Sequence, residues 1–218
     1  MPELLHADAL NALLVPVLQQ RMDDMGERES GAYNFYVQRL ARRNLLGGYE
    51  LKLAQKLLDS RFPVSAIHEI GPGYGQLVFL LAMNGINALG IEIDQRRYAT
   101  GAAMLAALLK AEPWLDGKCG MLEGGFPMAT LEAAAPHAMA LATNLVYTTT
   151  PQQQDVIVTA MRRYKMTIVD VDRLFAKRLT DEERKSAFAL FDRNGFAPPE
   201  PFLDLGADGR YYLFKPLQ

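Results

Sequence analysis

The stretch from residue 68 to residue 75 reads His68-Glu69-Ile70-Gly71-Pro72-Gly73-Tyr74-Gly75. It joins an expected strand, residues 66–70, to an apolar helix expected over residues 74–83. Its three glycines let the backbone turn tightly and approach a ligand with no Cβ in the way. Ligands of open parallel sheets bind beyond the carboxyl ends of the strands. The junction is therefore the first candidate for a binding loop.

The spacing of the glycines narrows the class of ligand. The dinucleotide fingerprint requires a third glycine at the sixth position of G-x-G-x-x-G, and that position is Gln76 in this chain. The observed pattern is E-x-G-x-G-x-G, with Glu69 two residues before the first glycine. A nicotinamide-dependent oxidoreductase stays an alternative, but Gln76 disfavours it.

A second acidic residue ends the next expected strand, residues 88–93, which contains Gly90-Ile91-Glu92-Ile93 and is followed by Asp94. A carboxylate at the end of this strand accepts two hydrogen bonds from the adjacent hydroxyls of a ribose. The glycine loop is thus followed by a helix and by a strand with an acidic residue at its end. This is the order that a nucleoside-binding α/β domain requires.

Strands and helices alternate through the rest of the chain. Further strands are expected near residues 118–122, 138–144, 166–171, 201–205 and 210–214, with helices over 95–110, after Thr150-Pro151 and after Thr180. Thr150 with Gln153, and Thr180 with Glu183, have the spacing of a capping box. Residues 129–142 predict a short helix, a break at Pro136 and a strand. Ala207-Asp208-Gly209 indicates a hairpin between the last two strands.

This alternation predicts an α/β fold, with a doubly wound, mostly parallel seven-stranded sheet that ends in an antiparallel hairpin. Residues 1–60 carry apolar residues at helical spacing, interrupted by a polar stretch, residues 23–31, and by Gly47-Gly48. We therefore expect an N-terminal helical extension over residues 1–60, packed on or capping the core, and a Rossmann-like domain over residues 61–218.

Composition limits the partners. The formal net charge is -2, whereas nucleic-acid binders usually carry a basic surplus, so no nucleic acid is expected. Arg39, Arg42 and Arg43 are the best candidates for a local basic patch, with a solvated helix face as the alternative.

No apolar run is long enough to cross a membrane, and the start has no basic leader, which predicts a cytoplasmic protein with no membrane partner. The oligomeric state is left open.

The cysteine and histidine content argues against a metal site. Cys119 is the single cysteine, and the three histidines, His6, His68 and His137, are scattered along the chain. No set of these residues has the spacing of metal ligands, so no metal is expected.

The two motifs, residues 69–75 and residues 90–94, resemble those of the class I S-adenosylmethionine-dependent methyltransferases, as does the order of elements from about residue 64 to residue 215. The resemblance implies S-adenosyl-L-methionine as the cofactor. It implies that the glycine loop follows the amino-acid part of the cofactor, that Glu69 favours its positive end and that Glu92 holds the ribose. The implied cofactor-binding residues are Glu69, Gly71, Pro72, Gly73, Gly75, Glu92, Ile93, Glu123, Gly124, Gly125, Phe126 and Asn144.

The turn after the third strand departs from the family pattern. Gly124-Gly125 stands where the family often has a glycine followed by an aspartate. Ile93 is expected to pack on the adenine, and recognition of the adenine edge is left to backbone groups, Phe126 or Glu123.

The segment after the fourth strand departs too. Thr143-Asn144-Leu145-Val146-Tyr147 lacks the proline box that methyltransferases of base amino groups often carry. We therefore expect methyl transfer to an oxygen or nitrogen of a small molecule, with a non-catalytic or regulatory S-adenosylmethionine-binding protein of the same fold as the alternative. Asn144, Tyr147 and Asp170 are the candidate catalytic residues. A turn-forming asparagine, a packing tyrosine and a loop carboxylate are the competing interpretations.

Overall fold

A seven-stranded sheet forms the centre of the computed structural model, which describes residues 4–25, 34–146, 149–176 and 178–217. The strands are β1 (Ala66–Ile70), β2 (Ala88–Glu92), β3 (Cys119–Glu123), β4 (Ala138–Ala142), β5 (Met166–Asp170), β6 (Glu200–Asp204) and β7 (Arg210–Phe214). Their order across the sheet is β3-β2-β1-β4-β5-β7-β6. The five strands from β3 to β5 are parallel, and β7 runs antiparallel to both β5 and β6. This confirms the predicted fold class.

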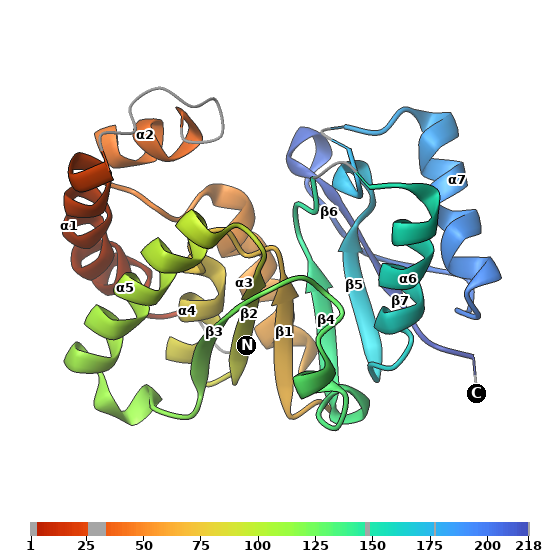
Figure 1. The fold of residues 1–218 in the computed structure, drawn as a ribbon, viewed down its shortest axis with the longest axis horizontal. Helices are drawn as coiled ribbons and strands as arrows, with labels where there is room; N and C mark the ends of the chain where they lie inside the picture. The colour runs from red at the N-terminus through yellow and green to blue at the C-terminus, as the bar shows by residue number, and fades with distance from the viewer. Residues whose placement is uncertain (1–3, 26–33, 147–148, 177, 218) are drawn as a thin grey trace.

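Helices cover both faces of the sheet (Figure 1). They are α1 (Ala7–Met25), α2 (Asn34–Ala41), α3 (Gly48–Ser60), α4 (Gln76–Met83), α5 (Gln95–Ala111), α6 (Pro151–Met161) and α7 (Asp181–Arg193). The first five share one apolar cluster with one face of the sheet, and α6 and α7 share a second cluster with the other face. The division into an extension over residues 1–60 and a domain over residues 61–218 stays a prediction.

Local sequence explains where several helices begin. Gly75 precedes α4 with φ +83°, a left-handed conformation that glycine adopts without strain, so the helix begins at Gln76, two residues later than expected. Both predicted capping boxes are present: Thr150 accepts from the Gln153 backbone N–H at α6, and Thr180 does the same for Glu183 at α7.

Two segments differ in detail from the expectation. Helix α1 continues to Met25, so the polar stretch expected from residue 23 begins inside a helix, and its remainder, residues 26–31, lies outside the described residues. The segment before β4 forms two 3₁₀ turns, η2 (Ala129–Leu131) and η3 (Ala135–His137), rather than a short α-helix. Pro136 lies in the second turn, where its missing N–H prevents a continuous helix.

The parallel strands point toward the upper side of Figure 1, and α2 lies on that side. The chain reverses its direction across the sheet between β1 and β4, because β2 and β3 lie on one side of β1 and β4 lies on the other. Such a reversal opens a crevice at the carboxyl ends of the two central strands. The glycine loop after β1 lies at this point.

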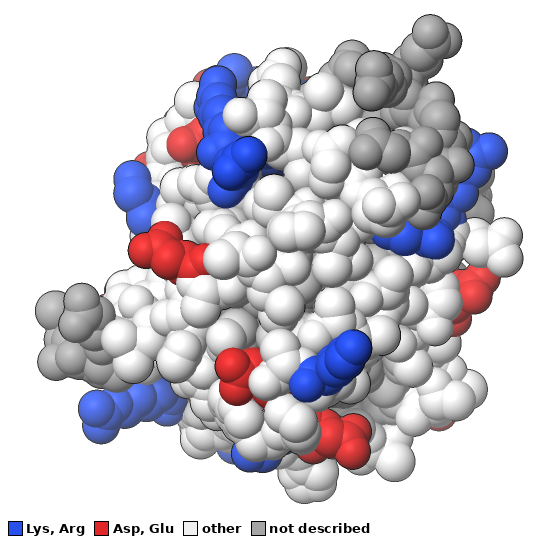
Figure 2. All heavy atoms as spheres, turned by 90° about the vertical axis from the view of Figure 1, so that its left-hand side faces the viewer, with Lys and Arg blue, Asp and Glu red and all other residues white. Residues whose placement is uncertain are grey.

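The face formed around α1 carries dispersed charge: Figure 2 shows its Lys and Arg side chains separated from one another by uncharged surface. Of the three arginines proposed for a basic patch, Arg42 and Arg43 are exposed, while Arg39 is buried. In the ranges that the structure describes, no helix is both long and apolar enough to span a bilayer.

Candidate functional site

The glycine loop is fixed by close packing on both sides. A Cβ on Gly73 would lie 2.6 Å from the Tyr36 hydroxyl oxygen of α2, and one on Gly75 would lie 2.7 Å from the Met121 sulfur of β3. Both glycines also have positive φ. Pro72 packs on Gly90 of β2, where a Cβ would lie 2.8 Å from the proline ring. The loop can therefore pack this closely against α2, β2 and β3 only because these positions lack side chains, and residues 72–75 are buried.

Glu92 ends β2 and ties the loop to it. One carboxylate oxygen accepts the backbone N–H of Gly73 at 2.8 Å, and the other accepts that of Asp94 at 2.9 Å. The side chain is buried, and burial raises the pKa of this carboxyl even though the two hydrogen bonds lower it. Two carboxylate oxygens offer about four acceptor positions, so two positions remain for a ligand.

Glu69 lies one residue before the end of β1, in an unusual environment for a carboxyl group. Its Oε1 accepts a hydrogen bond from the Thr143 hydroxyl at 2.9 Å, but its Oε2 is buried with no hydrogen-bond partner among the described residues. Burial raises its pKa to about 8, and the nearby carboxylates of Glu50 and Glu92 add to this rise. A cation placed against Oε2 would satisfy the oxygen and restore the charge.

An apolar pocket of about 360 Å³ opens beside the end of β2. Ile93 and Phe126 both line it, and the other lining residues come from α6 and the segment before it. The remaining lining residues are Thr149, Gln152, Gln153, Val156 and Ile157. The start of α6 was not predicted to contribute to this site, because the capping box locates a helix along the chain but not in space.

The turn after β3 borders this pocket. Gly124 donates its backbone N–H to the Glu92 carbonyl at 2.9 Å, and a Cβ on Gly125 would lie 3.4 Å from the Ile93 side chain. The Glu123 side chain is exposed at the strand end next to Glu92. Of the residues predicted in this turn, Phe126 lines the pocket, and Glu123, Gly124 and Gly125 do not.

The three candidate catalytic residues are not gathered at the glycine loop, unlike Glu69 and Glu92. Asn144 follows β4 with an exposed side chain, and Tyr147 lies outside the described residues. Asp170 ends β5, which β4 separates from β1. The register Glu69–Leu141–Ile168 leaves Asp170 two residues further along, so the usual strand spacing and rise place the two Cα atoms about 12 Å apart.

Asp170 binds the C-terminal hairpin. Its Oδ1 accepts the backbone N–H groups of Asp172 at 3.1 Å and Arg210 at 3.2 Å, while Arg173 lies 3.6 Å from Oδ2. Burial raises the pKa of this carboxyl to about 6. Tyr211 is its direct partner on β7, and the Tyr211 hydroxyl is buried with no hydrogen-bond partner in the described structure.

Sequence reasoning missed a polar network above the loop. Arg39 of α2 binds both carboxylate oxygens of Glu50 of α3, at 2.6 and 3.1 Å, and also donates to the Leu45 carbonyl. The Gln76 amide nitrogen of α4 lies 3.5 Å from Glu50 and 3.4 Å from the Tyr36 hydroxyl. All four polar side chains are buried.

The sequence did carry a signal for this network. Glu50 precedes Leu53, Ala54 and Leu57 at spacings of three, four and seven residues, so a charged residue occupies the apolar face of α3. A charge on a buried face calls for a partner. The partner, however, comes from another helix.

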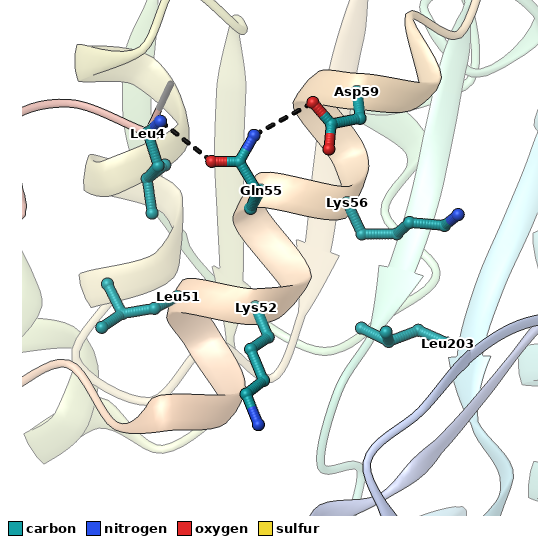
Figure 3. Close-up of a pocket in the computed structure, with 7 residues that line it drawn as sticks. All are labelled: Leu4, Leu51, Lys52, Gln55, Lys56, Asp59 and Leu203. Atoms are coloured by element: carbon teal, nitrogen blue, oxygen red, sulfur yellow. Dashed lines mark hydrogen bonds between the residues drawn. The ribbon is translucent and has the colours of Figure 1, made fainter. Parts of the chain in front are cut away.

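The larger surface groove, about 490 Å³, lies elsewhere (Figure 3). It is formed by the side of α3 that carries Lys52 and Lys56, with Leu203 of β6 opposite and Leu4 at one end. None of the predicted site residues lines it. Within the described ranges, no group of three or more His, Cys, Asp or Glu side chains has metal-binding geometry.

The fold is similar to solved structures that include methyltransferases. The methyltransferase domain of bacterial CtHen1 matches with a TM-score of 0.57 at 11% identity, over 77% of this chain and 97% of that domain. A mutant of MtNAS in complex with S-adenosylmethionine matches with a TM-score of 0.56 at 14% identity, over 97% of this chain and 76% of the other.

Magnesium protoporphyrin IX methyltransferase (ChlM) from Synechocystis PCC 6803, with bound S-adenosylmethionine, matches with a TM-score of 0.53 at 12% identity, over 92% of this chain and 97% of that one. Comparison with protein-family models found no match, and neither did comparison with curated proteins. The chain therefore has the fold of the class I S-adenosylmethionine-dependent methyltransferases.

Proposed function

We propose that the protein binds S-adenosylmethionine along residues 71–75 and transfers its methyl group to an oxygen or nitrogen of a small molecule. The observation that carries this proposal is the buried Glu69 carboxyl, whose Oε2 has no hydrogen-bond partner in the described part of the chain. Carboxylates, and no described cation, are the charged groups that act on it. S-adenosylmethionine would bring a sulfonium and an ammonium to this end of the loop.

The geometry of the site supports the other cofactor contacts that we propose. Glu92 is fixed by two backbone N–H groups and keeps acceptor capacity for two ribose hydroxyls. The apolar pocket of Ile93 and Phe126 beside Glu92 suits an adenine ring. A dinucleotide is disfavoured because Gln76 fills the position where its fingerprint needs a glycine for close packing of helix and strand.

The cofactor supplies an activated methyl group on its sulfonium, so the task of the protein is to align the acceptor with that carbon. Asn144, exposed beyond the end of β4, would hydrogen-bond the acceptor. Asp170, with a pKa of about 6, would take up the acceptor's proton. Its Oδ1 also holds the hairpin, so it serves as a base only if the acceptor reaches Oδ2.

The hydrogen bonds that Asp170 Oδ1 accepts from Asp172 and Arg210 also favour the second candidate, a non-catalytic protein that binds the same ligand. Turnover separates the two. S-adenosylmethionine is incubated with the protein and a panel of phenols, carboxylic acids and amines, and S-adenosylhomocysteine is measured. Calorimetric titration of S-adenosylhomocysteine and of NAD tests binding; NAD binding without S-adenosylhomocysteine binding contradicts both candidates.

A further inference from the structure

One face of the sheet gathers buried polar side chains near the carboxyl ends of its central strands. Directly paired residues of neighbouring strands share a face, and one such row crosses four strands: Glu69, Leu141, Ile168 and Leu213. Asp170 and Tyr211, which pair with each other, lie two residues from this row and therefore on the same face. The apolar members of the row belong to the cluster shared with α3. Glu69, Asp170 and Tyr211 thus lie on the face that α3 covers.

Tyr211 has a buried hydroxyl that lacks a partner. The residue is 1% exposed, and its hydroxyl oxygen makes no hydrogen bond within the described part of the chain. Asp170, its direct neighbour on β5, has a second such atom, Oδ2, although Arg173 lies 3.6 Å from it. Buried polar atoms are nearly always hydrogen-bonded. The two residues therefore mark a place where a bound molecule would supply the missing partners.

The charges around Tyr211 are mostly negative. Burial raises the pKa of its hydroxyl, and three carboxylates raise it further: those of Asp170, Glu50 and Glu69. Arg173 acts in the opposite direction. These groups belong to β5, α3, β1 and the 3₁₀ turn η4 (Val171–Arg173), so they surround the hydroxyl from several elements. The hydroxyl therefore stays neutral, in surroundings that favour a positively charged ligand group over a negatively charged one.

The arginines beside these carboxylates are already engaged. Arg39 binds the two carboxylate oxygens of Glu50, at 2.6 and 3.1 Å. Arg173 donates both of its terminal nitrogens to backbone carbonyls of the turn η5 (Gly206–Asp208), at 2.9 and 3.2 Å. An anionic ligand beside Tyr211 would thus meet carboxylates, while both guanidinium groups already bind other acceptors.

This charge pattern distinguishes the classes of methyl acceptor. A carboxylic acid or a phenol attacks the methyl carbon as an anion, which the carboxylates around Tyr211 disfavour. An amine reaches the site as an ammonium cation, which the same carboxylates favour, and it attacks as the neutral amine after it has lost a proton. Its N–H groups are donors for the Tyr211 oxygen and for Asp170 Oδ2.

We infer that the methyl acceptor is a primary or secondary amine, and that the Tyr211 hydroxyl oxygen binds it by accepting one of its N–H groups. The inference rests on the proposed function and narrows the acceptor atom from oxygen or nitrogen to nitrogen. Asp170 takes one proton from the ammonium and later releases it to solvent. The nitrogen lone pair then forms the bond to the methyl carbon, the carbon–sulfur bond breaks, and its electron pair stays on sulfur. The products are the methylated ammonium and S-adenosylhomocysteine.

The class of the product tests this inference without a known acceptor. The wild-type protein is incubated with trideuteromethyl S-adenosylmethionine and a protein-free small-molecule extract of its source cells, and an incubation without the protein is the blank. Mass spectrometry detects the labelled product, and its fragment ions show which atom carries the methyl group. A labelled amine is expected. A label on oxygen, in an ether or an ester, overturns the inference and leaves the proposed function standing.

Replacement of Tyr211 by phenylalanine tests the binding role of its hydroxyl. Tyr211→Phe should raise the KM of the identified amine by at least about fivefold, because one hydrogen bond to the acceptor is lost. The melting temperature should not fall, since the removed hydroxyl makes no hydrogen bond within the described structure. Tyr212→Phe, the same change at the next residue of β7, lies on the opposite face against Phe188. It is the matched control and should leave the KM unchanged.

The remaining outcomes are decisive as well. An unchanged KM in Tyr211→Phe overturns the inference, because the hydroxyl then does not bind the acceptor. If no labelled product forms on any atom, the proposed methyl transfer fails, and the inference fails with it. The product assay uses only the wild-type protein, so it decides the acceptor class even if Tyr211→Phe does not fold.

Discussion

Replacement of Glu92 by glutamine tests the nucleoside part of the site most directly. In the structure its two oxygens accept from the backbone N–H groups of Gly73 and Asp94, and each oxygen keeps one free position. Glutamine has one acceptor oxygen and one amino group. Glu92→Gln therefore leaves one backbone N–H facing another donor and removes one of the two positions proposed for the ribose.

The expected loss of stability and the expected loss of affinity follow from these two changes. An unsatisfied buried donor costs about 1–3 kcal/mol of folding free energy, and in a domain of this size 1 kcal/mol lowers the melting temperature by about 2–4 °C. Hydrogen bonds to charged groups contribute about 1.5–3 kcal/mol. Loss of one, with water competing, should weaken binding by at least about tenfold, or ~1.4 kcal/mol.

The assay is calorimetric titration of S-adenosylhomocysteine into the wild-type protein, Glu92→Gln and Glu92→Ala, with a thermal melt of each. Both variants should have a lower melting temperature than the wild-type protein and should bind S-adenosylhomocysteine more weakly. A lower melting temperature with wild-type affinity in both variants would refute the reasoning, because Glu92 would then only hold the loop and not the ligand.

Three further predictions concern the rest of the site. The free protein should become less stable as pH rises from about 4.5 to 8, because folded Glu69, with a pKa of about 8, keeps a proton that the unfolded chain releases near 4.5; melts across this range should show the slope, and Glu69→Gln should remove most of it. Asn144→Ala should lower kcat at least several-fold and leave S-adenosylhomocysteine affinity unchanged, and unchanged turnover would exclude it from acceptor positioning. Thr180→Ala removes the cap of α7 and should cost about 1 kcal/mol of stability; an unchanged melting temperature would contradict this.

The backbone of the candidate binding loop could be predicted well from the sequence. Gly73 and Gly75 have the positive φ that their spacing implied, and β1 and β7 have the bounds that were expected. These features are local: a strand ends, the loop needs residues without Cβ, and a helix begins. Their chemistry is therefore visible in consecutive residues.

The order of the last strands in the sheet could not be predicted from the sequence. The hairpin was expected at the edge, and β6 does form the edge, but β7 is inserted between β5 and β6. Pro201 suits an edge strand, since it cannot donate to a neighbour. Nothing local in the sequence states which strand of a hairpin pairs with β5, because that depends on which apolar face the helices leave open.

The sequence by itself determined the glycine loop, the acids that end β1 and β2, and the α/β alternation, since each depends on neighbouring residues and on backbone geometry. Only the tertiary structure decided what surrounds them. It placed the Arg39–Glu50 pair above Gln76, brought the start of α6 to the pocket of Ile93 and Phe126, and bound Asp170 to the C-terminal hairpin. The physical reason is that a buried polar group takes its partner from whatever segment packs against it, and packing joins residues that are far apart in the chain.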